Sequence, residues 1–129
     1  MKFLKSIVCV SVVLAITACG DNETAQSYIS KAEHQLVEKQ NSAAIISLKN
    51  ALKLDVKNAQ ARFLLGQLYL STGDAVNSVK ELEYANRLKY DANEVLPLLA
   101  RAYMLAESDE DLLALAGQEK QLTKPNTQY

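Results

Sequence analysis

The side chains that could do chemistry in this chain are few and lie far apart. Cys9 and Cys19 both fall near the start, and His34 is the only histidine of the 129 residues. The acidic run 109–111 directly precedes a leucine pair, a place where the dipole of a helix N-terminus favours carboxylates. A lone histidine with no second histidine or matched carboxylate makes a poor metal site or general base. We therefore expect no enzymatic activity, no metal site and no cofactor, and we expect His34 to pack against a neighbouring helix.

The segment before Cys19 has the order of a secretory signal. Lys2 and Lys5 precede the apolar run 7–16, which only Ser11 interrupts, and small residues follow it. Such a run would rise about 15 Å as a helix, roughly half of the hydrocarbon core of a bilayer. We therefore expect the segment 1–18 to be a signal peptide and not a permanent membrane span.

The ending Ile16-Thr17-Ala18-Cys19 resembles the lipobox of bacterial lipoproteins, although Ile16 stands where leucine is commoner. The resemblance implies that Cys19 receives a diacylglycerol, that the chain is cut before it, and that the new amino terminus is acylated. Several acyl chains anchor a protein stably. Segment 19–24 would then be the lipidated cysteine and a polar tether, and Gly20 after the cysteine favours the periplasmic leaflet of a Gram-negative outer membrane. The alternative is an ordinary signal peptide that happens to contain a cysteine.

The composition indicates a globular, helical domain. Hydrophobic residues make up 49% of the chain and charged residues 22%, while four glycines and two prolines leave room for few turns. Apolar residues recur at helical spacing, and no alternating strand pattern of useful length appears. The net charge is −1 with no basic stripe, so we expect no nucleic-acid partner.

Two stretches of the chain match each other at a constant offset. The matched pairs are Ala44 with Ser78, Leu48 with Leu82, Ala51 with Ala85, and Leu54 with Leu88. The offset equals the period of a tetratricopeptide (TPR) unit, about 34 residues, in which a pair of antiparallel helices must stack on further pairs to bury its apolar faces. The small residues expected at the eighth position of each unit are Ala32, Gly66 and Ala100. The alternative is a helical bundle without a repeat.

The repeat register predicts an all-α fold, a short TPR-type solenoid. We expect a TPR-like domain over 25–119, followed by a flexible tail over 120–129. Its units are 25–58, 59–92 and a partial third, 93–119, in which Leu112 replaces a small residue. The helices are expected over 25–39, from 41 or 42, from 59, over 75–88, after Asn93 and from 109. The expected N-caps are Thr24, Asn58, Asp74, Asn93 and Ser108, with Gly73 left-handed and Pro97 in a first turn.

Segments 48–52, 61–66 and 94–102 resemble one particular group, the TPR lipoproteins of the PEP-CTERM/exosortase sorting system (the PrsT-like group). The resemblance runs over about residues 21–116. It implies a role in exopolysaccharide production or in handling sorted surface proteins. Members of that group carry many more repeats, so this chain matches their amino-terminal portion, as a truncated relative, a fragment of a longer gene or a short paralogue.

The first helix of each unit should line the concave face of the stack and hold a partner there. The mixture of apolar, amide and charged side chains on that face suits an extended or helical peptide. Alternatively, Phe63, Leu70 and Met104 pack beneath a neighbouring helix. The residues expected on this face are Gln26, Ile29, Glu33, Val37, Gln60, Phe63, Gln67, Leu70, Ser71, Arg101 and Met104, with Leu36, Glu94 and Leu105 beside them.

These observations together predict a lipid-anchored periplasmic scaffold for protein–protein interaction. A pilotin-like or envelope-assembly TPR lipoprotein is one alternative, and a remnant of a longer lipoprotein gene is another. The last helix offers Leu112, Leu113 and Leu115 with only partial polar cover. Solenoids usually end in a polar cap, so we expect this end to fray, to pair with another copy, or to have once continued into further repeats.

Overall fold

Three helical hairpins make up the part of the chain that the computed structural model describes, residues 23–122. The predicted signal segment, Cys19 and most of the predicted tether lie outside the described residues, and so do residues 123–129. No strand occurs within 23–122, and no helix there is long and apolar enough to cross a membrane. The helices are α1 (Ala25–Val37), α2 (Asn41–Leu54), α3 (Ala59–Ser71), α4 (Ala75–Arg87), α5 (Ala92–Leu105) and α6 (Asp109–Leu122).

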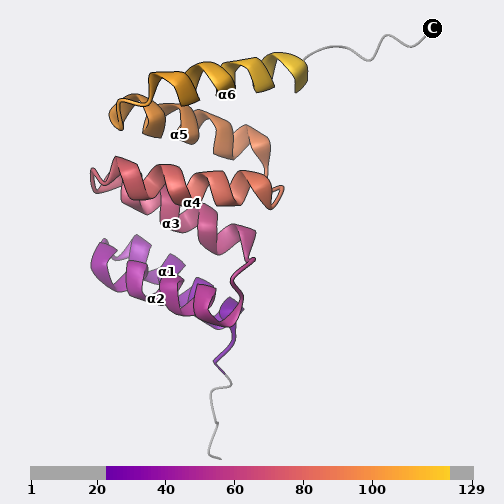
Figure 1. Cartoon of the computed structure of the whole chain (residues 1–129). Helices are drawn as coiled ribbons and strands as arrows, with labels where there is room; N and C mark the ends of the chain where they lie inside the picture. Colours follow the sequence, from indigo (N-terminus) through magenta and orange to yellow (C-terminus); the bar gives the residue numbers. More distant parts are fainter. Residues whose placement is uncertain (1–22, 123–129) are drawn as a thin grey trace, which may run out of the picture.

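The hairpins stack in chain order, as Figure 1 shows. α1 packs on α2, α3 on α4, and α5 on α6, while α3 also contacts α2, and α5 contacts both α4 and α3. Each new hairpin thus covers the one before it. This arrangement confirms the all-α helical repeat that the sequence register predicts.

The first helix of every hairpin ends in the same turn. Lys39, Gly73 and Glu107, which occupy the same position of their units, have φ angles of 59°, 86° and 57°. Such left-handed residues close a helix by turning the next N–H back onto a carbonyl of the last turn. Here the donors are Gln40, Asp74 and Ser108, and the acceptors are the carbonyls of Gln35, Tyr69 and Tyr103, at 2.8, 2.9 and 3.0 Å.

Three of the expected N-caps are confirmed. Thr24 forms a capping box with Ser27, and the side chains of Asn58 and Asp74 accept from the third helical N–H at 3.0 and 3.1 Å. Each cap satisfies a backbone donor that the helix itself leaves unpaired.

The predicted start of the fifth helix is wrong. Asp91, and not Asn93, is the N-cap, and its carboxylate accepts from the Asn93 N–H at 2.8 Å. The helix begins at Ala92, so Pro97 lies beyond the first turn. The left-handed residues Lys39 and Lys89 also end α1 at Val37 and α4 at Arg87, slightly earlier than expected.

Two clusters of buried side chains form the core. One joins α1, α2 and α3 around Ile29, Leu48 and Leu65, and the other joins α3, α4, α5 and α6 around Leu82 and Leu99. The small residues predicted from the register lie between the helices. Ala32, Ala44, Ala51, Ser78 and Ala85 are all fully buried.

Gly66 marks the closest approach of two helices in the middle hairpin. A Cβ atom at this position would lie 2.7 Å from Leu82 Cγ and 3.1 Å from the Leu82 backbone nitrogen. The Ser78 hydroxyl donates to the Gly66 carbonyl at 2.8 Å across the same contact. In the third hairpin Leu112 takes the place of Ser78, and α5 and α6 pack least closely of the three pairs.

We expect Gly66→Ala to lower the free energy of unfolding by about 1–2 kcal/mol, because the cost of overpacking exceeds the gain in helix propensity. Gly117→Ala is the matched control, since nothing lies within 4 Å of its Cβ position. That change should raise the free energy of unfolding by up to about 1 kcal/mol. Urea unfolding followed by circular dichroism measures both, and equal effects of the two changes would contradict the close contact.

Candidate binding surface

Three of the residues expected on the concave face belong to the core instead. Ile29, Phe63 and Leu70 are only 0%, 5% and 7% exposed. The Phe63 ring stacks on the Tyr90 ring with centroids 4.5 Å apart. These three side chains pack beneath the first helix of the next hairpin, as the alternative for Phe63 and Leu70 proposed. They therefore cannot contact a partner.

The remaining predicted residues stay at the surface formed by α1, α3 and α5, which we call the first-helix face. Gln60 is half-buried, and its amide donates to the Glu33 carboxylate at 3.0 Å, joining α3 to α1. The Ser71 hydroxyl donates to the Leu68 carbonyl at 2.8 Å. The exposed members are Gln26, Glu33, Val37, Gln67, Ser71, Arg101 and Met104.

A hollow of about 300 Å³ opens between the first two hairpins on this face. The walls come from α1, α3 and the start of α2. Two of the residues predicted to bind a partner, Gln67 and Ser71, line the hollow. Its volume is at the lower end for small-molecule pockets and would admit one or two side chains of a partner. The lining residues are Leu36, Asn41, Leu64, Gln67, Leu68 and Ser71.

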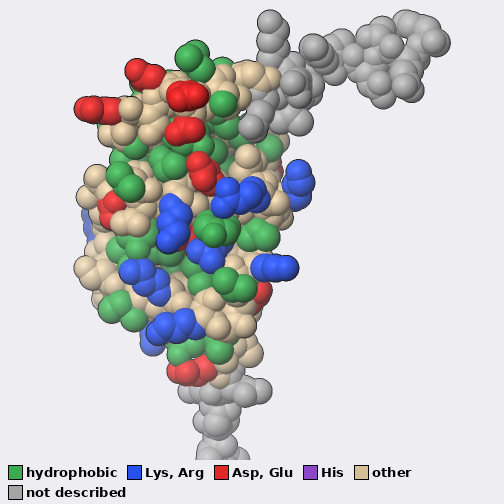
Figure 2. Space-filling view, viewed as in Figure 1, with side chains coloured by type: hydrophobic (Ala, Val, Ile, Leu, Met, Phe, Trp, Pro, Cys, Tyr) green, Lys and Arg blue, Asp and Glu red, His purple; other side chains and the backbone are tan. Residues whose placement is uncertain are grey.

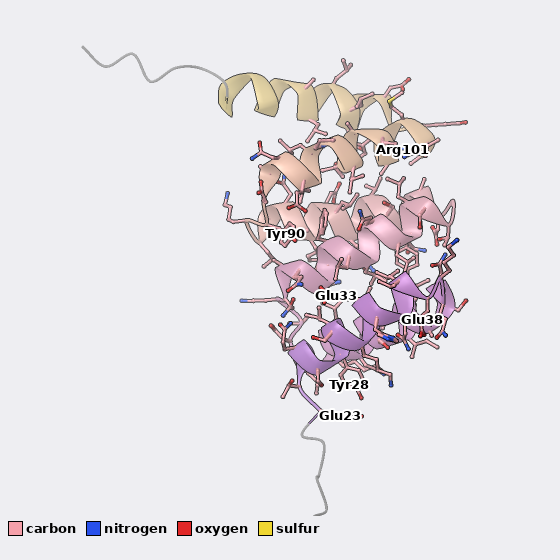
Figure 3. All side chains as sticks on the ribbon, turned by 180° about the vertical axis from the view of Figure 1, so that it is seen from behind. Glu23, Tyr28, Glu33, Glu38, Tyr90 and Arg101 are labelled. Carbon is pink, nitrogen blue, oxygen red and sulfur yellow. The ribbon has the colours of Figure 1, made fainter. Side chains whose placement is uncertain are left out.

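Three carboxylates act on Tyr90, which lies in the turn between α4 and α5. Burial raises the pKa of the Tyr90 phenol, and the charges of Glu94, Asp91 and Glu33 raise it further. Figure 3 shows Glu33 and Tyr90 on the same side of the molecule, with Arg101 farther along the stack. This part of the first-helix face is therefore acidic, which favours a basic group on a partner.

The expectation that His34 packs against a helix is wrong. Its side chain is 73% exposed, and Nδ1 lies 3.7 Å from Glu38 Oε2. The register explains the difference, because the equivalent Leu68 and Ala102 are buried at 3% and 0%. Those residues are covered by the hairpin before them, whereas α1 begins the described stack. Within the described residues, no group of three or more His, Cys, Asp or Glu side chains is placed to hold a metal ion.

A buried ion pair that the sequence does not predict links α3 to α4. Arg62 Nη1 lies 2.6 Å from Glu81 Oε2, with side-chain exposures of 12% and 8%. A second guanidinium nitrogen donates to the Val56 carbonyl at 3.2 Å. The signal in the sequence is an arginine at the fourth position of its unit, where a TPR unit usually has a large residue. Because the partner belongs to the next helix of the hairpin, the register alone does not identify it.

Two guanidinium groups approach the ring of Tyr84 on the exposed side of α4. Arg62 and Arg87 approach its ring centroid at 4.6 and 4.4 Å. Glu83 accepts from the Tyr103 hydroxyl at 2.8 Å, and burial together with this bond raises the pKa of Tyr103. Figure 2 shows Lys and Arg side chains gathered over the middle of this side, with acidic ones near α6.

Comparison with known proteins identifies the fold. No protein-family model and no curated protein sequence matches this chain. Among solved structures, it is similar to the crystal structure of MamA protein, a TPR-containing protein, with a TM-score of 0.67 and 18% sequence identity. The match covers 82% of this chain and 61% of that one, so this chain spans less than two thirds of MamA. The chain thus has a TPR-like helical-repeat fold.

We expect Glu81→Ala to lower the free energy of unfolding by about 3 kcal/mol, because it leaves the buried Arg62 guanidinium without its partner. The double change Arg62→Leu with Glu81→Leu should recover most of that loss. Glu38→Ala, which removes an exposed partner, should cost less than about 0.5 kcal/mol. Thermal unfolding measures all three, and a cost for Glu81→Ala as small as that for Glu38→Ala would contradict the pair's role.

Proposed function

We propose that this chain is a non-catalytic, lipid-anchored periplasmic scaffold that holds a protein or peptide on its first-helix face. The observation that carries the proposal is the hollow at Gln67 and Ser71, which lies between two hairpins and has apolar walls with polar groups at its edge. Peptide-binding grooves commonly combine apolar pockets with side chains that bond to the peptide backbone.

The chemistry of the face suggests how a partner would be held. An apolar side chain of the partner would contact Leu36 and Leu64 in the hollow, while the exposed Gln67 amide can donate to and accept from a peptide backbone. The carboxylates of Glu33, Asp91 and Glu94 would attract a lysine or arginine at the opposite end of the partner. We infer that the partner is an extended or helical segment with one apolar anchor and a basic flank.

The anchor part of the proposal rests on the lipobox-like sequence ending at Cys19. Helix α1 begins at Ala25, so at most about 20 Å of extended chain would separate it from the lipidated residue. The domain would then act close to the membrane, at the periplasmic leaflet of the outer membrane. The resemblance to PEP-CTERM/exosortase lipoproteins makes surface-protein sorting or exopolysaccharide production the process we propose.

We expect Cys19→Ser to move the protein from the membrane fraction, because the acyl chains that would anchor it can no longer be attached. Fractionation with an antibody against the chain measures this. Cys9→Ser is the matched control and should leave the distribution unchanged, since Cys9 lies within the apolar part of the signal. Retention of the Cys19→Ser variant in membranes at the original level would refute the anchor.

We expect a photoreactive side chain at Gln67 to capture the partner in intact cells, because Gln67 borders the hollow. The same group at Lys80, an exposed residue of α4, is the control. Crosslinked products identified by mass spectrometry should come from Gln67 and not from Lys80. The reverse result would place the partner on the other side of the stack and overturn the proposed site.

A further inference from the structure

The last hairpin exposes apolar side chains that its predecessor buries. In the middle hairpin, Phe63, Leu70, Val79 and Leu82 share a cluster with residues of α5. Their equivalents one repeat later, Pro97, Met104, Leu113 and Ala116, are all exposed, and Met104 and Leu113 reach 66% and 75%. We call these last four residues the terminal face.

An apolar hollow of about 320 Å³ adjoins the terminal face between α5 and α6. Leu112 lines this hollow. It occupies the repeat position at which the small residues Ala44 and Ser78 allow the two helices of the other hairpins to pack closely. Apolar surface of this kind is normally covered in a soluble protein. The lining residues are Leu96, Pro97, Ala100, Leu112, Leu115 and Ala116.

The structure contains two examples of what covers such a face. α3 covers the first hairpin, and α5 covers the second. Each covering helix presents a small or β-branched residue, two leucines and a further apolar residue at i, i+3, i+4 and i+7. The two sets are Ala61, Leu64, Leu65 and Leu68, and Val95, Leu98, Leu99 and Ala102, all buried or half-buried. The terminal face continues this interface, so its natural occupant is a helix of the same pattern.

Neither α1 of a second copy nor the segment 123–129 has this pattern. The four equivalent positions of α1 are Ser27, Ser30, Lys31 and His34, all exposed and polar. The α1 helix of a second copy would therefore offer only polar side chains to the terminal face and would leave its apolar surface uncovered. Segment 123–129 contains Pro125 and lacks the leucine pair of this pattern.

Charge adds a second requirement on the occupant. Glu107, Asp109, Glu110 and Asp111 are exposed where α6 begins, whereas the equivalent residues 73, 75, 76 and 77 are uncharged. α5 runs antiparallel to α4, so an occupant in the same relation to α6 would place its C-terminal turn beside these carboxylates. Lysine or arginine there would be attracted to them and would also suit the occupant's own dipole.

We propose that the terminal face binds an amphipathic helix of a partner polypeptide. This helix carries a small or β-branched residue, two leucines and a further apolar residue at i, i+3, i+4 and i+7, with basic residues in its last turn. This inference rests on the proposed function as an interaction scaffold, and it adds a second site and a class of partner. The helix would stack on the third hairpin as α3 and α5 stack on the first two.

A labelled peptide with the sequence of residues 58–72 tests the proposal. It carries the α3 pattern, with Phe63→Gln and Leu70→Gln to remove its other apolar side and two lysines added at its end. A peptide of residues 24–38 with the same lysines is the control, because it has the polar α1 pattern. The full chain, expressed in a Gram-negative host and purified in detergent, is titrated into each peptide while fluorescence anisotropy is recorded.

We expect saturable binding of the first peptide and none of the second. Leu113→Glu should weaken binding at least roughly tenfold by placing a charge in the apolar contact, whereas Ile46→Glu, at an exposed residue of α2, should leave it unchanged. Replacing Asp109, Glu110 and Asp111 by their amides should weaken binding of the lysine-tagged peptide more than binding of an untagged one.

Three results of the peptide titrations would overturn the proposal: no binding of the first peptide, equal binding of both peptides, or no effect of Leu113→Glu. Sedimentation of the chain without peptide is the remaining test. A dimer that Leu113→Glu dissociates would assign the terminal face to a second copy instead. Gln67→Arg should not change peptide binding. Absence of peptide binding would therefore not count against the Gln67 crosslink. Absence of that crosslink would likewise not count against peptide binding at the terminal face.

Discussion

Each hairpin of this chain has an apolar face that its own two helices cannot cover, and the remaining structure depends on how that face is buried. In the first two hairpins the next helix covers it, which produces two separate clusters in a row and not one central core. A fold of this kind is stabilised mainly between neighbours. The residues at the contacts between hairpins therefore determine both stability and what surface remains for binding.

Much of the architecture can be predicted because its signals are local. Thr24, Asn58 and Asp74 cap helices through bonds to residues only three positions away. The small residues at Ala32, Ala44 and Gly66 fall at fixed places in the repeat register and are buried where the register puts them. The start of the fifth helix is harder to predict because Asp91 and Asn93 are both good caps, and the choice between them depends on the preceding turn.

The binding surface is harder to predict because it depends on contacts between hairpins. Ile29, Phe63 and Leu70 have the spacing of inner-face residues, yet the following helix covers them. His34 shows the opposite effect, since no described helix covers the position that Leu68 and Ala102 occupy in later hairpins. The Arg62–Glu81 pair likewise joins two helices and replaces a packing residue. Periodicity identifies the helix face but not which neighbour lies over it.

The recurring left-handed turn explains how such a stack tolerates change in its sequence. The same backbone closure occurs at Lys39, Gly73 and Glu107, although only one of the three is a glycine. A non-glycine residue costs about 1 kcal/mol or more in this conformation, an amount that hairpin packing can offset. The turn between the two helices of each hairpin is therefore held by backbone hydrogen bonds, which do not depend on a particular side chain. Hairpins of the same shape can therefore be built from sequences that share few residues, as the structural similarity to MamA at 18% identity illustrates.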